Sequence, residues 1–223
     1  MITMKNKYLL LFVSSLFLII SLNAQEENKN EYVFEEFRDG RLVFKKGNAV
    51  LAKFNYDALD ERMMFLSDDG TILELANPTE VSFVNIDGHI FEHIKGKTFY
   101  ERINYDDLTL YIQWKYKAES KGKASGYGTT SKTSSISNIS TISRDGKNFQ
   151  LDIAENYSFK SNNYYYIKIK KNQKRFYSAD SLAKLFKGHE DEIKKYIKDK
   201  NIDFNNIDNI KTVAEYCSQF IKE

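Results

Sequence analysis

Glycine-containing pairs divide the middle of this chain into short segments of similar length. The pairs are Asp39-Gly40, Lys46-Gly47, Asp69-Gly70, Asp87-Gly88 and Lys95-Gly96. Glycine tolerates a positive φ and aspartate bonds its own backbone two residues on, so such pairs close β-hairpins. The segments between them, such as RLVFK, EVSFVNI and TFYERI, are rich in β-branched and aromatic residues and mostly too short for a helix. The pattern predicts an antiparallel β-meander.

Further strands are expected on both sides of this region, at residues 32–37, 108–117, 149–153 and 164–169. The clearest is 108–117, because large apolar side chains occupy every second position there: Leu108, Leu110, Ile112, Trp114 and Tyr116. Aromatic residues make up 14% of the chain, and they favour half-buried pleated surfaces. We therefore expect a mainly β protein (α+β overall), with an antiparallel β domain over residues 32–177 that forms a sandwich or a partly open barrel.

The hydrophobic period changes to that of a helix in residues 178–223. Ser178 or Asp180 can cap a first helix, and Gly188 ends it. The acidic residues 190–192 favour the start of a second helix, where the helix dipole is positive. A third helix is predicted from an apolar stripe at Ile207, Ile210, Val213, Ala214, Cys217 and Phe220. We expect three short helices that pack together as a small cap.

Residues 1–24 have the composition of a cleavable secretory signal peptide. Lys5 and Lys7 precede an apolar run from Tyr8 to Leu22, and Asn23-Ala24 forms a small-residue exit. A membrane anchor is the alternative, but the run is shorter than the roughly 20 residues that a spanning helix needs. Residues 25–31 are then a polar leader. The expected location is secreted or periplasmic, with no transmembrane segment in the mature chain.

Residues 119–143 differ in composition from the rest, since Ser, Thr, Gly and Lys dominate. Such a segment buries little apolar area, which predicts a flexible insert between strands. Ile136, Ile139 and Ile142 recur at every third position, and long loops in compact domains are often functional. Both interpretations stay open, with the plain loop favoured.

Charge and cysteine content limit the function classes. The formal net charge is only +2 with 29% charged residues, whereas a dedicated nucleic-acid binder concentrates excess positive charge. No nucleic-acid partner is expected. Cys217 is the single cysteine, so no intrachain disulfide can form, and its place on an apolar helical stripe favours a buried hydrophobic role over a nucleophilic one.

One short motif matches a metal-site pattern. His89, Glu92 and His93 fit the H-x-x-E-H spacing of inverted zinc proteases. That chemistry needs a helix, whereas the motif follows an Asp-Gly turn and alternates with apolar residues as a strand does. Residues four apart on a strand lie about 13 Å apart, too far to share one zinc ion. We therefore expect surface polar roles for these residues, and no metal or cofactor.

The strongest candidate for ligand binding is the tyrosine cluster with its neighbouring lysines: Tyr164, Tyr165, Tyr166, Lys168 and Lys170. Aromatic rings beside cations stack on sugars or on single-stranded nucleic acid. The expected export favours a carbohydrate or a cell-surface ligand. No catalytic residue is predicted, because no His is linked in sequence to a plausible nucleophile. The acidic pairs Asp68-Asp69 and Asp106-Asp107 lack calcium-loop spacing and are expected as turn residues.

Two stretches resemble a known group. The first has the pattern DGRLVF, AKFNYDALDERMMFL and GTILELANPTEVSFVNIDG, and the second is the helical tail SLAKLFKGHEDEIKKYIKDKNIDFNNIDNIKTVAEY. Both resemble uncharacterised secreted proteins of Bacteroidota-type bacteria. The short N-terminal segment that ends in LNAQ is similar to theirs too. The resemblance covers most of the mature chain outside residues 119–143. It implies lineage and secretion, and it implies no catalytic residue or cofactor.

Together these observations predict a non-catalytic binding or structural module of the bacterial cell envelope, with an envelope protein or a carbohydrate as partner. The alternative is a secreted hydrolase whose carboxylates come together only in the fold. Carboxylates with opposed pKa shifts in a deep cleft would favour the hydrolase, and an exposed aromatic surface would favour binding. A third possibility is an assembly factor that uses the helical tail.

Overall fold

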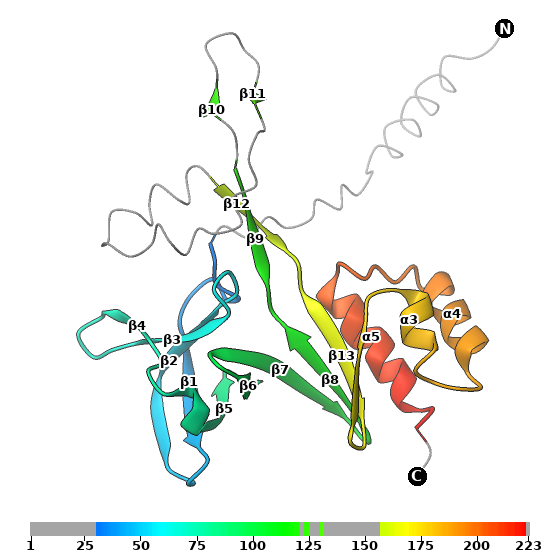
Figure 1. Cartoon of the computed structure of the whole chain (residues 1–223), viewed down its shortest axis with the longest axis horizontal. Coiled ribbons are helices and arrows are strands. Elements are labelled where there is room, and N and C mark those ends of the chain that lie inside the picture. The colour runs from blue at the N-terminus through cyan, green and yellow to red at the C-terminus, as the bar shows by residue number, and fades with distance from the viewer. Residues whose placement is uncertain (1–29, 121–122, 125–129, 132–156, 222–223) are drawn as a thin grey trace, which may run out of the picture.

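The computed structural model describes residues 30–120, 123–124, 130–131 and 157–221. The main element of the fold is one antiparallel sheet with the strand order β14-β13-β8-β7-β6-β5-β1-β2-β3-β4 (Figure 1). The strands are β1 (Arg38–Phe44), β2 (Ala49–Asp57), β3 (Arg62–Leu66), β4 (Ile72–Glu74), β5 (Val81–Ile86), β6 (His89–Lys95), β7 (Thr98–Tyr105), β8 (Leu108–Gln113), β13 (Tyr164–Ile169) and β14 (Asn172–Phe176). The predicted fold class, mainly β with three short helices, is confirmed.

The sheet is continuous and strongly curled, yet open. Its edge strands are β14 and β4, and no pairing joins them within the described residues. The curl brings β2 close to β7, although three strands separate them in the sheet: the backbone N–H of Phe99 donates to the hydroxyl of Tyr56, at 3.3 Å. Both residues are fully buried. A single sheet therefore wraps one hydrophobic cluster, which includes Phe54, Met63 and Phe91.

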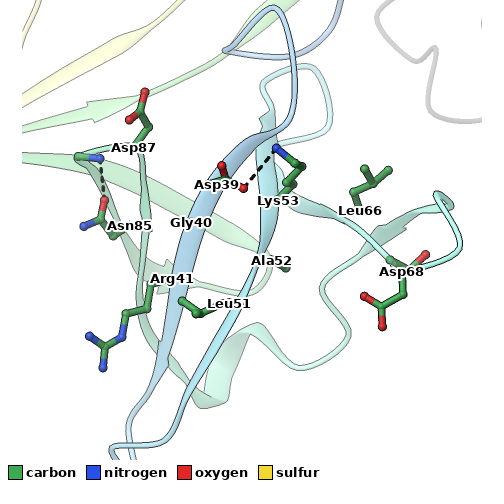
Figure 2. Close-up of a pocket in the computed structure, with 12 residues that line it drawn as sticks. Asp39, Gly40, Arg41, Leu51, Ala52, Lys53, Leu66, Asp68, Asn85 and Asp87 are labelled. Carbon is green, nitrogen blue, oxygen red and sulfur yellow. Dashed lines mark hydrogen bonds and ion pairs between the residues drawn. The ribbon is translucent and has the colours of Figure 1, made fainter.

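Four of the five glycine pairs lie at turns, as predicted, with Gly47, Gly70, Gly88 and Gly96 at positive φ. The prediction for Asp39-Gly40 is wrong, because both residues lie inside β1. A Cβ atom on Gly40 would stand 2.7 Å from the backbone oxygen of Asn85 and 2.8 Å from the ring of Phe54. Figure 2 shows Gly40 on β1 beside β2 and Asn85. This glycine therefore permits a close approach of neighbouring chains rather than a reversal.

The predicted first strand at residues 32–37 is also wrong. Only an isolated bridge between Tyr32 and Asp57 joins this segment to the sheet. The buried side chain of Asn55 holds it instead: the carboxamide accepts from the backbone N–H of Phe34 and donates to the backbone oxygens of Phe34 and Glu36. These hydrogen bonds replace those of a β-ladder, so the segment packs Phe34 into the core although it is not a strand.

The strand predicted at 108–117 is broken at Trp114 and Lys115. It continues as β9 (Tyr116–Ser120), which pairs with β12 (Tyr157–Ser161), just as β8 pairs with β13. At the break, the backbone N–H of Lys115 donates to the side chain of Asn163. The resulting two-stranded ribbon leaves the main sheet, and the short strands β10 (Lys123–Ala124) and β11 (Thr130–Ser131) lie beyond it (Figure 1).

The three predicted helices are α3 (Ala179–Ala183), α4 (Glu190–Asp199) and α5 (Ile207–Ser218). Ser178 caps α3 by accepting from the backbone N–H of Ser181, and Asn206 caps α5 in the same way through Asn209. The helices gather on one side of β8 and β13 (Figure 1). They are therefore a layer of the same domain and not a separate cap.

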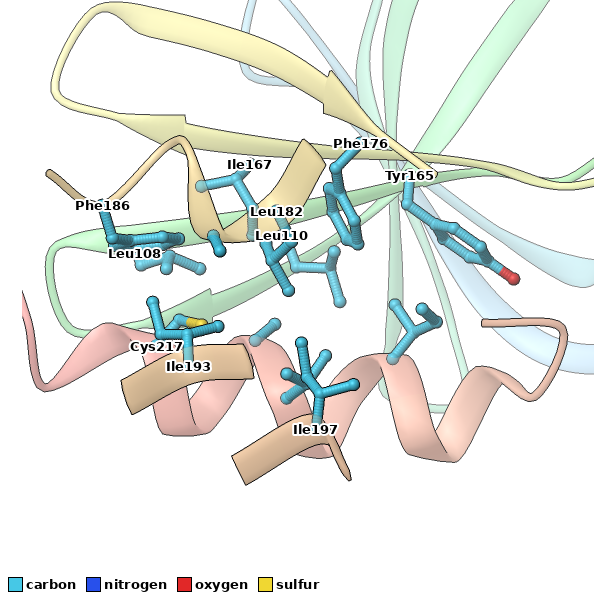
Figure 3. Close-up of a cluster of buried hydrophobic side chains, with 14 of the residues drawn as sticks. Leu108, Leu110, Tyr165, Ile167, Phe176, Leu182, Phe186, Ile193, Ile197 and Cys217 are labelled. Carbon is cyan, nitrogen blue, oxygen red and sulfur yellow. The ribbon is translucent and has the colours of Figure 1, made fainter. Parts of the chain in front are cut away.

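One buried cluster joins this helical layer to the sheet (Figure 3). The sheet contributes alternate residues of three strands, and each helix contributes one apolar face. Burying a side chain of leucine size contributes about 1.5–3 kcal/mol, so this interface is a main source of stability. Its members include Leu108, Leu110, Ile112, Tyr165, Ile167, Phe176, Leu182, Ile193, Ile197, Ile210, Val213 and Cys217.

Several predictions concern other parts of the chain. The signal peptide (1–24), nearly all of the polar leader (25–31), most of the insert (119–143) and the strand at 149–153 lie outside the described residues. Pro78–Glu80 forms a 3-10 turn before β5. Among the described helices, none has the length and apolar character that a membrane crossing requires.

We expect Gly40→Ala to lower the free energy of unfolding by about 1–3 kcal/mol, because the new methyl group meets a backbone oxygen that cannot move away cheaply. Urea denaturation of the purified protein measures the change. Arg41→Ala is the matched control, since Arg41 is the next residue of β1 and its side chain is exposed. Equal stability of the two variants would contradict the close approach at Gly40.

Candidate functional site

The three residues of the zinc-like motif lie on strand β6, as predicted, and they do not converge. His89 and His93 share one side of the strand and Glu92 lies on the other. His93 Nε2 lies 3.0 Å from the backbone oxygen of Gly96, while Glu92 accepts from Arg102 and Tyr111. Within the described ranges no group of three His, Cys, Asp or Glu residues is placed to hold a metal ion.

His89 instead belongs to a polar trio around the buried carboxylate of Glu101. Its Nδ1 atom lies 2.7 Å from Glu101 Oε1, and the indole N–H of Trp114 donates to Glu101 Oε2 at 2.7 Å. The Glu101 side chain is 3% exposed, so both of its oxygens need these partners. The trio fastens β6, β7 and the residue after β8 together, which is a structural role.

Strand alternation divides the predicted tyrosine cluster. Tyr165 points into the helical cluster and is 5% exposed, so its place in a binding surface is wrong. Lys170 lies in the turn between β13 and β14 with a φ of +54°. Tyr164, Tyr166 and Lys168 remain, and they share the opposite face of β13, the one that the helices leave uncovered.

Residues of neighbouring strands extend this uncovered face. The sheet register places Arg102, Tyr111, Tyr166 and Arg175 side by side across β7, β8, β13 and β14. Gln113 pairs with Tyr164 in the row beside it, and Tyr100 stacks on Tyr166 with ring centroids 5.4 Å apart. We call the surface formed by Tyr100, Tyr111, Tyr164 and Tyr166 the tyrosine face. Strand alternation in TFYERI and LTLYIQ is the sequence signal for its two additional tyrosines, but only the register places them beside Tyr164 and Tyr166.

Cations lie against the rings of the tyrosine face. The guanidinium carbon of Arg175 is 3.6 Å from the ring centroid of Tyr164, and Lys168 Nζ is 5.9 Å from that of Tyr111. Such contacts are electrostatically favourable, since the face of an aromatic ring is negative. Tyr111 and Tyr100 are nearly buried, while Tyr164 and Tyr166 are half-buried and provide the accessible rings.

Hydrogen bonds hold the polar side chains of this face in place. The Tyr111 hydroxyl donates to Glu92 at 3.0 Å, and Arg102 donates to the same oxygen at 3.2 Å. Burial, followed by the charge of Glu92, raises the pKa of Tyr111 to about 12, so it stays a neutral donor. At the end of the face, Glu61 accepts from both Gln113 and Lys115. The surface is therefore preorganised, with ordered rings, donors and acceptors.

A second candidate is a shallow hollow of ≈ 720 Å³ over β1, β2, β3 and β5 (Figure 2). Its charges are mixed, and Lys53 Nζ lies 3.2 Å from Asp39 in an exposed ion pair. Leu51 at its floor is 79% exposed. Exposed pairs of this kind are worth at most about 1 kcal/mol, and nothing in the hollow concentrates one charge or one type of side chain. The tyrosine face is the better-defined site.

Carboxylates converge elsewhere, around Arg62. Its guanidinium binds Asp57 at 3.0 Å, Asp60 at 2.8 Å and Glu74 at 3.3 Å. Burial raises the pKa of Asp57 to about 6. Burial would also raise the pKa of Glu74, but the hydrogen bond and charge of Lys97, with Arg62, outweigh it and hold that pKa below the usual value.

The geometry around Arg62 fits a structural role. Asp57 Oδ1 accepts from the backbone N–H groups of Leu59 and Asp60, and its other oxygen is bound by Arg62. Its side chain is only 4% exposed. The group therefore builds the turn between β2 and β3. Cys217 is equally enclosed, as predicted, and burial raises the pKa of its thiol to about 12.

The buried Asp57 predicts a specific pH dependence of stability. Because its pKa is raised in the folded state, the protein binds a proton between about pH 4 and pH 6 that the unfolded chain has released. Stability from this group is complete below about pH 4 and is lost as the pH rises through about 6, by about 3 kcal/mol. We expect the Asp57→Asn variant not to lose this stability as the pH rises. The measurement is the unfolding free energy of the wild type minus that of the variant, determined at each pH. Parallel pH profiles would contradict it.

Comparisons of the chain with protein-family models, with curated proteins and with solved structures found no match.

Proposed function

We propose that this protein is a non-catalytic binding module of the bacterial cell envelope, secreted or periplasmic, whose tyrosine face takes a carbohydrate ligand. The observation that carries the proposal is the row of Arg102, Tyr111, Tyr166 and Arg175 across four strands. The other side of β8, β13 and β14 is filled by the helices. The tyrosines are thus not needed for the core that those helices form.

The chemistry of the face suits a sugar. Half-buried rings such as those of Tyr164 and Tyr166 offer an apolar surface for the C–H groups of a pyranose, with polar atoms at the ring edge. Glu92 and Gln113 provide acceptors for hydroxyl groups, and Arg175 provides donors. A few convergent polar groups around an apolar platform are typical of small-molecule and sugar recognition.

Export to the envelope is the part of the proposal that rests on residues 1–24. Their positive start, apolar run and small-residue exit support cleavage after Ala24. N-terminal sequencing of the protein recovered from an envelope or culture-medium fraction of an expressing bacterium would test it. A mature chain that begins at Gln25 is expected, and a chain that keeps Met1 would overturn this part.

The hydrolase alternative has less support. Carboxylates with opposed pKa shifts in a deep cleft would favour it, but Asp57 and Glu74, which have such shifts, are both bound to Arg62. Neither lines the hollow of Figure 2. The assembly-factor alternative uses the helical tail, but the apolar faces of α4 and α5 are buried in the cluster that joins the helices to the sheet.

We expect Tyr166→Ala to weaken glycan binding by about tenfold or more, because a central ring of an interface contributes more than 1 kcal/mol. Binding to an array of bacterial cell-wall and capsular glycans, followed by titration of the best ligand, measures the effect. Tyr177→Ala is the matched control, since Tyr177 is 72% exposed at the end of β14 and outside the tyrosine face. Thermal unfolding verifies that both variants fold. Unchanged binding by a folded Tyr166→Ala would refute the site.

A further inference from the structure

Positive charge is concentrated in one part of the described chain. Residues 157–177 contain six basic residues and no acidic one, although the whole chain has 33 basic and 31 acidic residues. Five of the six belong to the hairpin of β13 and β14, at Lys168, Lys170, Lys171, Lys174 and Arg175. This hairpin borders the tyrosine face, to which it contributes Tyr164 and Tyr166.

In the part of the chain that the structure describes, these five cations have no carboxylate partner. Within the described residues, no Asp or Glu oxygen lies within 4.0 Å of their charged nitrogens. The neighbouring Arg102 and Lys115 differ, because Glu92 and Glu61 neutralise them. The tyrosine face therefore has neutral polar groups over β7 and β8 and uncompensated positive charge over β13 and β14.

Protection of a sheet edge explains only some of these residues. Lysine and arginine on an edge strand hinder pairing with another chain, and β14 is an edge strand. Lys168, however, lies on β13, which pairs with β8 on one side and β14 on the other. Its charge therefore needs a different explanation, and its Nζ atom stands over the ring of Tyr111.

We infer that the tyrosine face recognises a negatively charged polysaccharide, with Lys168 and Arg175 as the residues that bind its anionic groups; this inference rests on the proposed carbohydrate-binding function. Arg175 covers one side of the Tyr164 ring and Lys168 lies over the Tyr111 ring, so a sugar that binds beside these rings has its substituents next to a cation. Lys170, in the hairpin turn, extends this series of cations beyond Lys168. Residues two apart on a strand are separated by about 7 Å. A line of charges suits a polymer better than a single anion.

The acidic residues of the same surface favour a sugar over a nucleic acid. Glu92 binds the hydroxyl of Tyr111, and Glu61 binds Gln113 and Lys115, so carboxylate oxygens lie among the rings that Lys168 and Arg175 contact. Carboxylate oxygens accept hydrogen bonds from sugar hydroxyls, whereas the phosphate oxygens of a nucleic-acid backbone are acceptors themselves and offer them no donor. A hydroxyl-rich chain with uronate or sulfate groups provides partners for both the acceptors and the cations of this face.

The test compares polygalacturonate with neutral dextran of similar length, using the full chain and isothermal titration calorimetry. The informative variant is the double substitution Lys168→Gln with Arg175→Gln. The matched control is Lys187→Gln with Lys200→Gln, which removes the same charge from exposed lysines beside the helices. We expect polygalacturonate to bind more tightly than dextran, with affinity at least tenfold lower in the double variant, within twofold of wild type in the control, and lower at high salt.

Each other outcome overturns the inference. Equal binding of dextran and polygalacturonate, with loss only in Tyr166→Ala, removes the charge preference and keeps the proposed function. Equal losses of affinity in the double variant and in its lysine control indicate nonspecific electrostatic attraction. Tighter binding of oligothymidylate or of phosphatidylglycerol vesicles indicates another class of partner. Failure of both glycans, and of the wider glycan array, removes the inference and the proposed function together. If the double variant does not fold, Lys168→Gln alone is compared with Lys187→Gln.

Discussion

Trp114 is the point at which the three hydrophobic clusters of the described structure meet. Its ring packs against the cluster under the helices, the cluster inside the curl of the sheet, and the small cluster of the β9–β12 ribbon. Its indole N–H is bound by buried Glu101, which also binds His89. A buried carboxylate without such partners is strongly unfavourable, so these three side chains must be placed together. The break after β8 and the direction of the ribbon both depend on that placement.

The curl and the helices use the same face of the sheet in different places. Near β1, β2 and β3 the sheet wraps around its own side chains, and near β8, β13 and β14 it packs against α3, α4 and α5. The opposite face of this second half needs no apolar packing. Tyrosines, arginines and glutamates can occupy it because each ring has a cation or another ring beside it. The candidate binding surface is thus a consequence of one-sided packing.

Two segments near the start of the sheet fold differently from what their residues predict. Asp39-Gly40 has the residues of a turn but lies inside a strand, because only glycine lets β1 approach Asn85 and Phe54 so closely. In residues 32–37, Tyr32 and Phe34 have the spacing of one strand face, yet Asn55 binds this segment through its side chain. Neither Asn55 nor Gly40 is unusual in the sequence. Their roles are set by residues that are distant in the sequence, such as Phe34 for Asn55 and Asn85 for Gly40.

Local residue chemistry was sufficient for the mainly β class, for four turns, for the three helices, and for rejecting a helix at His89–His93. Of the two predicted caps, Ser178 is the one that α3 uses, and the predicted end of this helix at Gly188 is wrong, because α3 ends at Ala183. The sequence also singles out the tyrosine and lysine cluster at 164–170, whose role as a binding site stays a prediction. Only the tertiary structure decided which of those side chains face outward, and that Arg102, Tyr111 and Arg175 lie beside them. It also decided that Glu101 and Asp57 are buried. The physical reason is range: turns and helix ends depend on residues a few positions apart, whereas a cross-strand row depends on a register between β7, β8, β13 and β14 that the curl of the whole sheet selects.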